Sequence, residues 1–185
     1  MEKKYKLTDE TINLCGKKLC RIKALKDFED VKKGDKGGFI EDEHNLSHDG
    51  NSWVCGDAMV YGNAMVCGNA MVCGDAMVYG NAMVCGDAWV CCDARVCGNA
   101  RVCGDAMVYG NAKIENKFDY IVFKNWWSSG RCFTWTRSND MWKVGCFYGT
   151  GEELIKKAYK DSELSGRQYE RIVKYVEEIK KENGK

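Results

Sequence analysis

The chain has 185 residues, of which 45% are hydrophobic, 30% are charged and 11% are aromatic. This composition excludes wholesale disorder, and no stretch approaches the roughly 18 consecutive apolar residues of a membrane-spanning helix. Because 28 Lys and Arg face 27 Asp and Glu, the net charge of +1 gives no global electrostatic argument for a nucleic-acid partner. The charged start MEKKYKLTDE has no apolar signal region, so we expect a soluble, cytoplasmic protein without membrane contact.

The first segment, residues 1–35, is strongly charged and reads as an N-terminal cap. Strand-like runs at 11–14 and 18–24 flank the turn sequence Cys15-Gly16-Lys17, which predicts a β-hairpin. An open end of a repetitive β-structure would expose unpaired backbone groups and an apolar interior. We therefore expect this hairpin to cover the first coil of the repeats that follow.

The middle of the chain is dominated by ten contiguous copies of the hexad Val-(Cys/Tyr)-Gly-(Asp/Asn)-Ala-x, at residues 54–113. A six-residue period is too short for a helical repeat and predicts a parallel β-helix. Because strand side chains alternate between faces, Val and Ala point inward and the residue between them points outward. The Gly-(Asp/Asn) pair belongs at the corner, where positive φ is tolerated. With one irregular coil before the hexads, the β-helix is expected over residues 36–116.

These hexads resemble the left-handed β-helix family of hexapeptide-repeat proteins, whose coils take three hexads, about 18 residues. Residues 25–48 and 124–131 resemble the flanks of members carried by bacteria and their phages, which are labelled polymer-forming proteins or acyltransferases. The resemblance implies a left-handed sense, and for a homo-oligomer it favours a trimer. For a phage-encoded protein it implies a location in the bacterial host cytosol.

Stacking the hexads with this coil length sorts the outward residues into three columns that are rich in Met and Trp. Solvated faces of repeat proteins are normally polar, so these columns predict a covered exterior, either in a subunit interface or under the terminal segments. The residues expected in an oligomer interface are Met59, Met65, Met71, Met77, Met83, Trp89 and Met107.

The last segment, residues 117–185, predicts a small α+β module. Three strand-like runs separated by Ser, Asn and Gly turn residues predict an antiparallel, three-stranded meander. The runs are 118–124, 131–137 and 142–148. Two helices follow, and each is expected to begin at a capping box, Thr150 with Glu153 and Ser165 with Gln168.

The chemistry of an enzyme is largely missing from the sequence. Many left-handed β-helix proteins are acyltransferases that use a His as general base beside an extruded loop. This chain has only His44 and His48, and its hexads contain no insertion. A zinc site of the type found in the carbonic-anhydrase branch of the fold needs three His. We therefore expect no enzyme activity, no metal and no cofactor.

Twelve cysteines are present, and seven of them share the second hexad place with Tyr61, Tyr79 and Tyr109. The simplest interpretation is a place that accepts a mid-sized, partly buried side chain. Stacked cysteines such as Cys55 and Cys73 would lie about 4.8 Å apart, near the lower end of disulfide reach. Free thiols are expected in a reducing cytosol, although oxidation in vitro stays open.

The most chemically distinctive segment is a cluster of Trp and cationic residues after the repeats. Bases stack on aromatic rings while cations meet phosphates, and Trp and Arg are also common in protein interfaces. Both a host protein and a nucleic-acid or nucleotide ligand therefore fit, and core packing explains about half of the Trp residues equally well. The expected binding residues are Trp126, Trp127, Arg131, Trp135, Arg137, Trp142 and Lys143.

Together these features favour a non-catalytic binding or assembly protein. A narrower hypothesis is a phage-derived counter-defence protein that blocks a host nuclease or effector, or sequesters a nucleotide signal. The alternatives are an acyltransferase-like hexapeptide-repeat enzyme and a structural or polymer-forming phage component.

Overall fold

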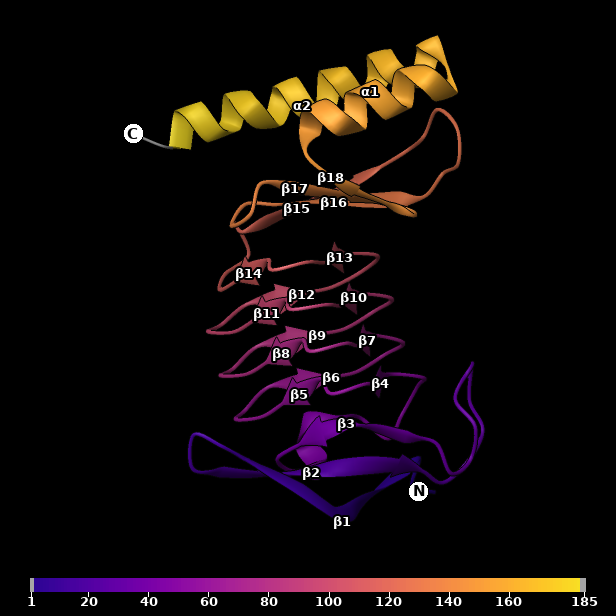
Figure 1. Ribbon diagram of the computed structural model, residues 1–185, viewed down its shortest axis with the longest axis vertical. Helices are drawn as coiled ribbons and strands as arrows, with labels where there is room; N and C mark the ends of the chain where they lie inside the picture. The colour runs from indigo at the N-terminus through magenta and orange to yellow at the C-terminus, as the bar shows by residue number, and fades with distance from the viewer. Residues whose placement is uncertain (1, 184–185) are drawn as a thin grey trace.

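The computed structural model describes residues 2–183 and shows three parts stacked along one long axis (Figure 1). A group of N-terminal strands lies at one end, a parallel β-solenoid forms the middle, and a sheet with two helices lies at the other end. The mainly β architecture predicted from the hexads is confirmed.

The solenoid is built from the eleven two-residue strands β4 to β14, which follow the hexad spacing and stack into three parallel ladders. The first ladder contains β4 (Trp53–Val54), β7 (Met71–Val72), β10 (Trp89–Val90) and β13 (Met107–Val108). The second contains β5 (Met59–Val60), β8 (Met77–Val78), β11 (Arg95–Val96) and β14 (Lys113–Ile114). The third contains β6 (Met65–Val66), β9 (Met83–Val84) and β12 (Arg101–Val102). The register joins residues 18 apart, such as Met71 with Trp89, which confirms the expected coil length.

The solenoid interior consists of the invariant hexad residues. Every Val and Ala of the ten hexads is at most 1% exposed. Successive coils are joined by backbone hydrogen bonds, for example from Met59 N–H to Ala76 O at 2.9 Å. The third hexad place adopts positive φ in every coil, and Cys92 does so at +66° although it is not glycine. The core therefore excludes water, and the backbone conformation is most restricted at the corners.

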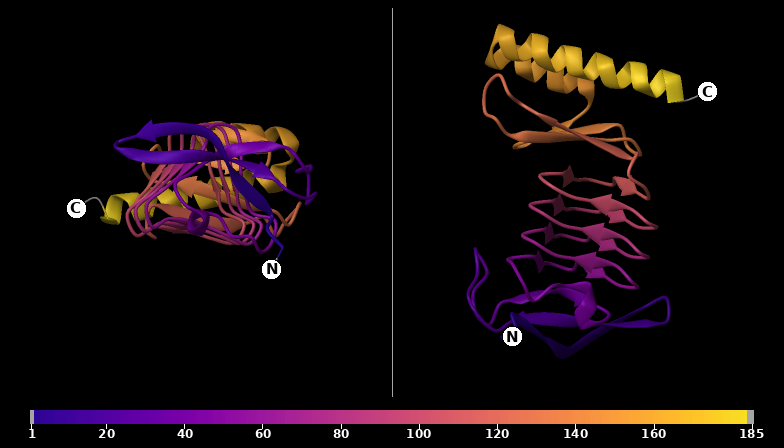
Figure 2. Two further views of the ribbon diagram at one scale, coloured as in Figure 1. Left: turned by 90° about the horizontal axis from the view of Figure 1, so that it is seen from below. Right: turned by 180° about the vertical axis from the view of Figure 1, so that it is seen from behind.

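The N-terminal strands extend one solenoid ladder. Strands β1 (Tyr5–Leu14) and β2 (Lys17–Ala24) form the expected hairpin, although its first strand is longer than predicted. Strand β3 (Lys36–Ile40) pairs antiparallel with β2 and parallel with β5. Hairpin and solenoid therefore share one seven-stranded sheet, and the hairpin lies across the first coil (Figure 2, left).

The C-terminal sheet has four antiparallel strands, so the prediction of a three-stranded meander is wrong. Its strands are β15 (Tyr120–Lys124), β16 (Cys132–Thr136), β17 (Met141–Val144) and β18 (Phe147–Gly149). The run predicted as one strand at 142–148 is divided by a turn, because Gly145 takes a φ of +54° that reverses the chain.

Two helices, α1 (Gly151–Asp161) and α2 (Glu163–Asn183), lie on the face of this sheet that points away from the solenoid (Figures 1 and 2). The capping box of Thr150 and Glu153 is confirmed. The predicted start of the second helix at Ser165 is wrong, because Ser162 Oγ accepts the Ser165 N–H at 3.1 Å and the helix begins earlier. No helix within residues 2–183 is both long and apolar enough to cross a membrane.

Candidate binding groove

A groove of about 580 Å³ lies where the C-terminal sheet meets one face of the solenoid. We call it the junction groove. Its solenoid wall contains Asp87, Trp89, Asp105, Met107 and Tyr109, and its sheet wall contains Lys124, Gly130, Arg131, Cys132, Lys143 and Gly145.

Both walls are fixed by backbone pairing. Trp89 and Met107 are neighbours in one parallel ladder, so their outward side chains lie one above the other on the same face. The sheet is held on the last coil because Thr134 Oγ1 of β16 accepts the Met107 N–H at 2.8 Å. This hydrogen bond helps to place the cations of the sheet wall, Lys124, Arg131 and Lys143, beside the solenoid face that carries Trp89.

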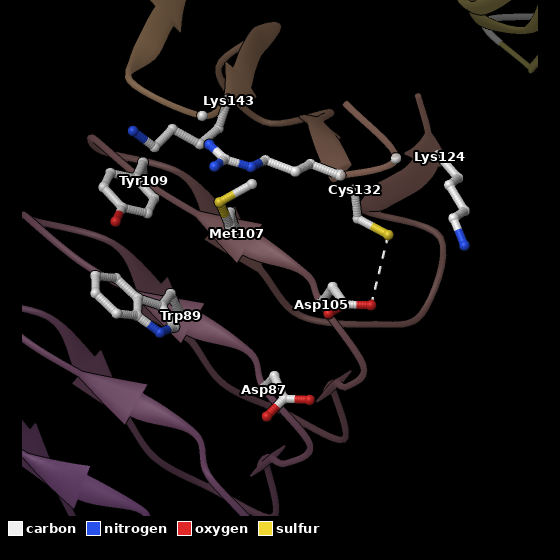
Figure 3. A pocket seen from close by; sticks show the side chains of 11 residues that line it. Asp87, Trp89, Asp105, Met107, Tyr109, Lys124, Cys132 and Lys143 are labelled. Carbon is white, nitrogen blue, oxygen red and sulfur yellow. Dashed lines mark hydrogen bonds between the residues drawn. The ribbon is translucent and has the colours of Figure 1, made fainter. Parts of the chain in front are cut away.

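The aromatic side of the groove combines two rings with a cation (Figure 3). Lys143 Nζ lies 4.2 Å from the centroid of the Tyr109 ring, a cation–π contact. Burial raises the pKa of Tyr109 to about 12, so this phenol stays neutral at physiological pH. Trp89, one coil below Met107, is 45% exposed and offers an open ring face to solvent.

The other side of the groove carries two carboxylates (Figure 3). Asp105 accepts a hydrogen bond from the Cys132 thiol at 3.5 Å, and Asp87 accepts one from the Asn69 amide at 3.0 Å. Within residues 2–183, by contrast, the side chains of Lys124 and Arg131 make no hydrogen bond or ion pair. Both carboxylates thus have donors from the chain itself, whereas these two cations remain available to an external anion.

The expected binding residues divide between different places in the structure. Arg131 and Lys143 line the junction groove. Trp126 is 74% exposed on the loop after β15, outside the groove. Trp127 is partly buried, with its ring centroid 5.0 Å from that of Tyr169. Arg137 lines a separate hollow of about 760 Å³ between the sheet and α2.

Two of the expected binding residues are core residues, which corrects the prediction. Trp135 is 3% exposed and Trp142 is 2% exposed, and both belong to the apolar cluster between the sheet and the helices. Trp135 Nε1 donates to Asp140 Oδ1 at 2.8 Å, so its polar atom is satisfied inside the fold. Their main role is therefore to pack the core, although Trp135 also reaches the wall of the hollow that Arg137 lines.

The residues expected in an oligomer interface are also divided. Trp89 and Met107 lie in the junction groove, and Met71 lines a hollow next to it. On the other two faces Met65 is 39% exposed, while Met59, Met77 and Met83 are half-buried. Self-association through these columns stays a prediction. The sequence treated Trp89 and Arg131 as parts of two different surfaces, and the structure brings them into one groove.

Lys124 belongs to the cations that the sequence places among the Trp cluster, whereas Tyr109 and the two carboxylates of the groove were not predicted as binding residues. Tyr109 occupies the same hexad place as the cysteines below it and differs from Tyr61 and Tyr79 only by its position in the last coil. Those two rings stack on each other at 5.2 Å. One feature of the sequence could have indicated Tyr109. It is the last residue of its column, so the segment that follows the repeats must pack near it.

The two histidines have structural partners. His48 Nδ1 accepts the Lys4 N–H at 3.2 Å, and its ring stacks on Tyr5 with centroids 4.3 Å apart. Because Nδ1 is the acceptor, Nε2 carries the proton of the neutral ring. His44 contacts Asp42 Oδ1 at 3.0 Å and Gly62 O at 2.8 Å. Neither ring lines the junction groove.

The expectation of free thiols is wrong at one pair, because Cys55 and Cys73 form a disulfide. The two residues lie one coil apart with a Cα–Cα distance of 4.7 Å, within the range that a disulfide spans. The stacking that placed them at this distance was predicted, and the bond between them was not. The other ten cysteines are free. Within residues 2–183, no group of three or more metal-ligating side chains could hold a metal ion.

The ladders, the 18-residue coil and the invariant interior define this chain as a parallel β-solenoid repeat protein. Five segments match the family described as YdcK beta solenoid repeat, at residues 54–68, 70–86, 76–91, 94–110 and 100–114. The match covers the solenoid and leaves both flanks, including the sheet wall of the groove, outside it. No curated protein matches the chain. The left-handed sense of the coil stays a prediction.

Proposed function

We propose that this protein is a non-catalytic binding protein that takes a nucleotide into the junction groove. The observation that carries the proposal is the position of the open Trp89 ring in the same groove as Arg131, Lys124 and Lys143. An aromatic ring stacks on a nucleobase, and Lys and Arg bind phosphate through charge-assisted hydrogen bonds. The groove supplies both kinds of contact over a short distance.

The charge distribution gives the ligand an orientation. The uncharged base stacks on the Trp89 ring, and this contact requires no cation. The phosphates lie toward Arg131 and Lys143 on the sheet wall. Asp87 and Asp105 on the opposite side repel phosphate, so the anionic part of the ligand stays on the side of Tyr109 and Lys143. Arg131 is the best suited of the three cations, because its planar guanidinium can bind two phosphate oxygens at once.

The non-catalytic part of the proposal rests on the histidines. A general base needs a free acceptor nitrogen within reach of the proton that it removes. The acceptor of His48 is occupied by the Lys4 N–H, and His44 is engaged by Asp42 and Gly62. Both belong to the segment between β3 and β4, and this segment lies at the end of the solenoid opposite the C-terminal sheet (Figure 1).

Calorimetric titration with ATP and GTP tests the proposal, with adenosine and inorganic pyrophosphate as probes for the two halves of the ligand. Trp89→Ala should weaken nucleotide binding by roughly ten-fold or more, since base stacking on an aromatic ring contributes about 1–3 kcal/mol. Trp126→Ala is the matched control, because this ring is exposed outside the groove. Arg131→Ala should also reduce affinity, whereas Arg137→Ala, in the separate hollow, should not.

Loss of binding in both Trp variants, or in both Arg variants, would move the site away from the groove. Failure of every nucleotide to bind wild-type protein would refute this function and favour the alternative of a protein partner, for which the exposed Trp126 is the strongest anchor. The narrower hypotheses, namely counter-defence, phage origin, a cytosolic location and a homotrimer, stay predictions. A structural or acyltransferase-like role is the remaining alternative.

A further inference from the structure

A second column of cysteines follows the third ladder of the solenoid. Cys67, Cys85 and Cys103 occupy the same hexad place in successive coils, each 18 residues from the next. The Cys85 thiol points at Cys103, with the two Sγ atoms 2.7 Å apart, and both residues are partly exposed. The same 18-residue relation already joins Cys55 to Cys73 in a disulfide on another edge of the solenoid.

We infer that Cys85 and Cys103 are a second disulfide site, which closes by exchange with a low-molecular-weight disulfide such as oxidised glutathione. Stacking in a parallel ladder holds the two residues at the spacing that such a bond requires. Their partial exposure admits the small oxidant. The two coils are held in register by backbone hydrogen bonds such as that from Cys85 N–H to Val102 O at 2.9 Å.

The exchange proceeds in two steps. The Cys103 thiolate attacks one sulfur of the small disulfide, which breaks its S–S bond and releases one small thiolate that takes up a proton. The Cys85 thiol then gives its proton to solvent and attacks Cys103 Sγ, which expels the second small thiolate. Two protein thiols are oxidised and one small disulfide is reduced to two thiols. The Cys85 thiol donates to Cys103 Sγ at 2.7 Å, and this direction assigns the first attack to Cys103. In agreement, burial raises the pKa of the Cys85 thiol to about 12.

The position of this site couples it to the junction groove. Cys85 is followed after one residue by Asp87, and Cys103 is followed in the same way by Asp105. A bond between the two cysteines therefore joins the coil that carries Trp89 to the coil that carries Met107. The solenoid wall of the groove would be covalently fixed in the oxidised protein and held by non-covalent contacts alone in the reduced one.

The positions of the trypsin cleavage sites place the two cysteines in different peptides, so the bond between them can be detected directly. The full chain is incubated with oxidised glutathione, alkylated without reduction and digested with trypsin. Cleavage at Lys36, Arg95, Arg101 and Lys113 places Cys85 in peptide 37–95 and Cys103 alone in peptide 102–113. We expect mass spectrometry to detect these two peptides joined by a disulfide that dithiothreitol removes. Fragmentation of the joined peptides identifies the linked cysteine without any variant.

Two matched variants complete the experiment. Cys85→Ser should abolish the joined peptides, and Cys67→Ser, in the same column one coil further down, should leave them intact. The inference is overturned if wild-type protein shows no joined peptides, if it retains only glutathione on peptide 102–113, or if fragmentation assigns the bond to a cysteine other than Cys85. Persistence of the joined peptides in Cys85→Ser would overturn it as well.

Discussion

The two ends of the solenoid are closed by different means. At the N-terminal end the backbone ladder continues, because β3 pairs with β5 and the hairpin pairs with β3. The carbonyl groups that remain receive hydrogen bonds from side chains: Lys4 Nζ donates to Ser52 O at 2.7 Å and to Gly50 O at 3.2 Å. Tyr5 Oη donates to Leu46 O at 2.8 Å.

At the C-terminal end no strand of the sheet pairs with the last coil. Its free N–H groups are instead met by side-chain acceptors. Met107 N–H donates to Thr134 Oγ1, Lys113 N–H to Ser138 Oγ at 2.6 Å, and Glu115 N–H to Asp119 Oδ2 at 2.7 Å.

The difference shows that a buried ladder end can be satisfied either by more backbone or by well-placed side chains. The side-chain closure leaves a space between sheet and solenoid at one edge, and this space is the junction groove. The backbone closure concentrates its polar contacts on Lys4, which is fully buried. The two ends should therefore differ in their sensitivity to single substitutions.

The largest expected effect is at Lys4. Lys4→Met keeps the length of the side chain but leaves the carbonyl groups of Ser52, which is buried, and Gly50 without this donor. Since hydrogen bonds to charged groups contribute about 1.5–3 kcal/mol, unfolding in urea should show a loss of about 2–3 kcal/mol. Lys6→Met is the matched control, because Lys6 is exposed on β1 and its replacement should change stability little.

The pH dependence sharpens this prediction. Burial lowers the pKa of Lys4 from its usual 10.5 to about 8. Between these values the unfolded chain binds more protons at this group than the folded protein does, so the stability contributed by Lys4 rises with pH. The stability difference between wild type and Lys4→Met should therefore grow from pH 8 to pH 10. A difference that is constant over this range would contradict the lowered pKa of Lys4 in the folded protein.

A smaller effect is expected at the opposite end. Thr134→Val conserves shape but removes the acceptor of the Met107 N–H, which should reduce the free energy of unfolding by about 1–2 kcal/mol. Thr11→Val, at an exposed position of β1, provides the comparison. If Thr134→Val costs as much as Lys4→Met, the distinction between the two closures fails.

Much of the fold could be predicted, because the repeated hexad determines both the interior residues and the length of a coil. Invariant Val and Ala define the interior, and the period defines which residues stack, so Met71 and Trp89 were correctly assigned to one column. The turn at Gly145 was missed because the run around it is apolar enough to read as one strand. The Cys55–Cys73 bond was missed because stacking indicates proximity but not oxidation state.

The candidate site was only partly predictable, for a physical reason. Its two walls come from segments that are far apart in sequence. The side chains that join them, such as Thr134 and Ser138, show no pattern in the sequence that would indicate this contact. Arg131 and Lys143 were identified by their charge and Trp89 by its exposed column. Trp135 and Trp142 carried the same signal as Trp126, since sequence alone does not distinguish the buried face of a short strand from its exposed face.

The smallest expected effect lies between the two ends, at Cys92. Its φ of +66° is strained for any residue with a Cβ, by about 1–2 kcal/mol, and glycine relieves this strain while it loses about 0.5–1 kcal/mol to the entropy of the unfolded chain. Cys92→Gly should therefore stabilise the protein by about 0.5–1 kcal/mol, which corresponds to a rise of about 2 °C in the melting temperature.

Two reciprocal substitutions separate backbone strain from crowding between coils. A Cβ added at Gly104 in the last coil would meet nothing within 4 Å, so Gly104→Ala should show only the cost of positive φ. A Cβ added at Gly86 would lie 2.8 Å from Gly104 N, so Gly86→Ala should cost more. Equal losses at the two glycines would mean that the coils yield freely at their corners. In that case the last coil would be no less constrained than the interior ones, and its closure by side chains would make no difference at this edge.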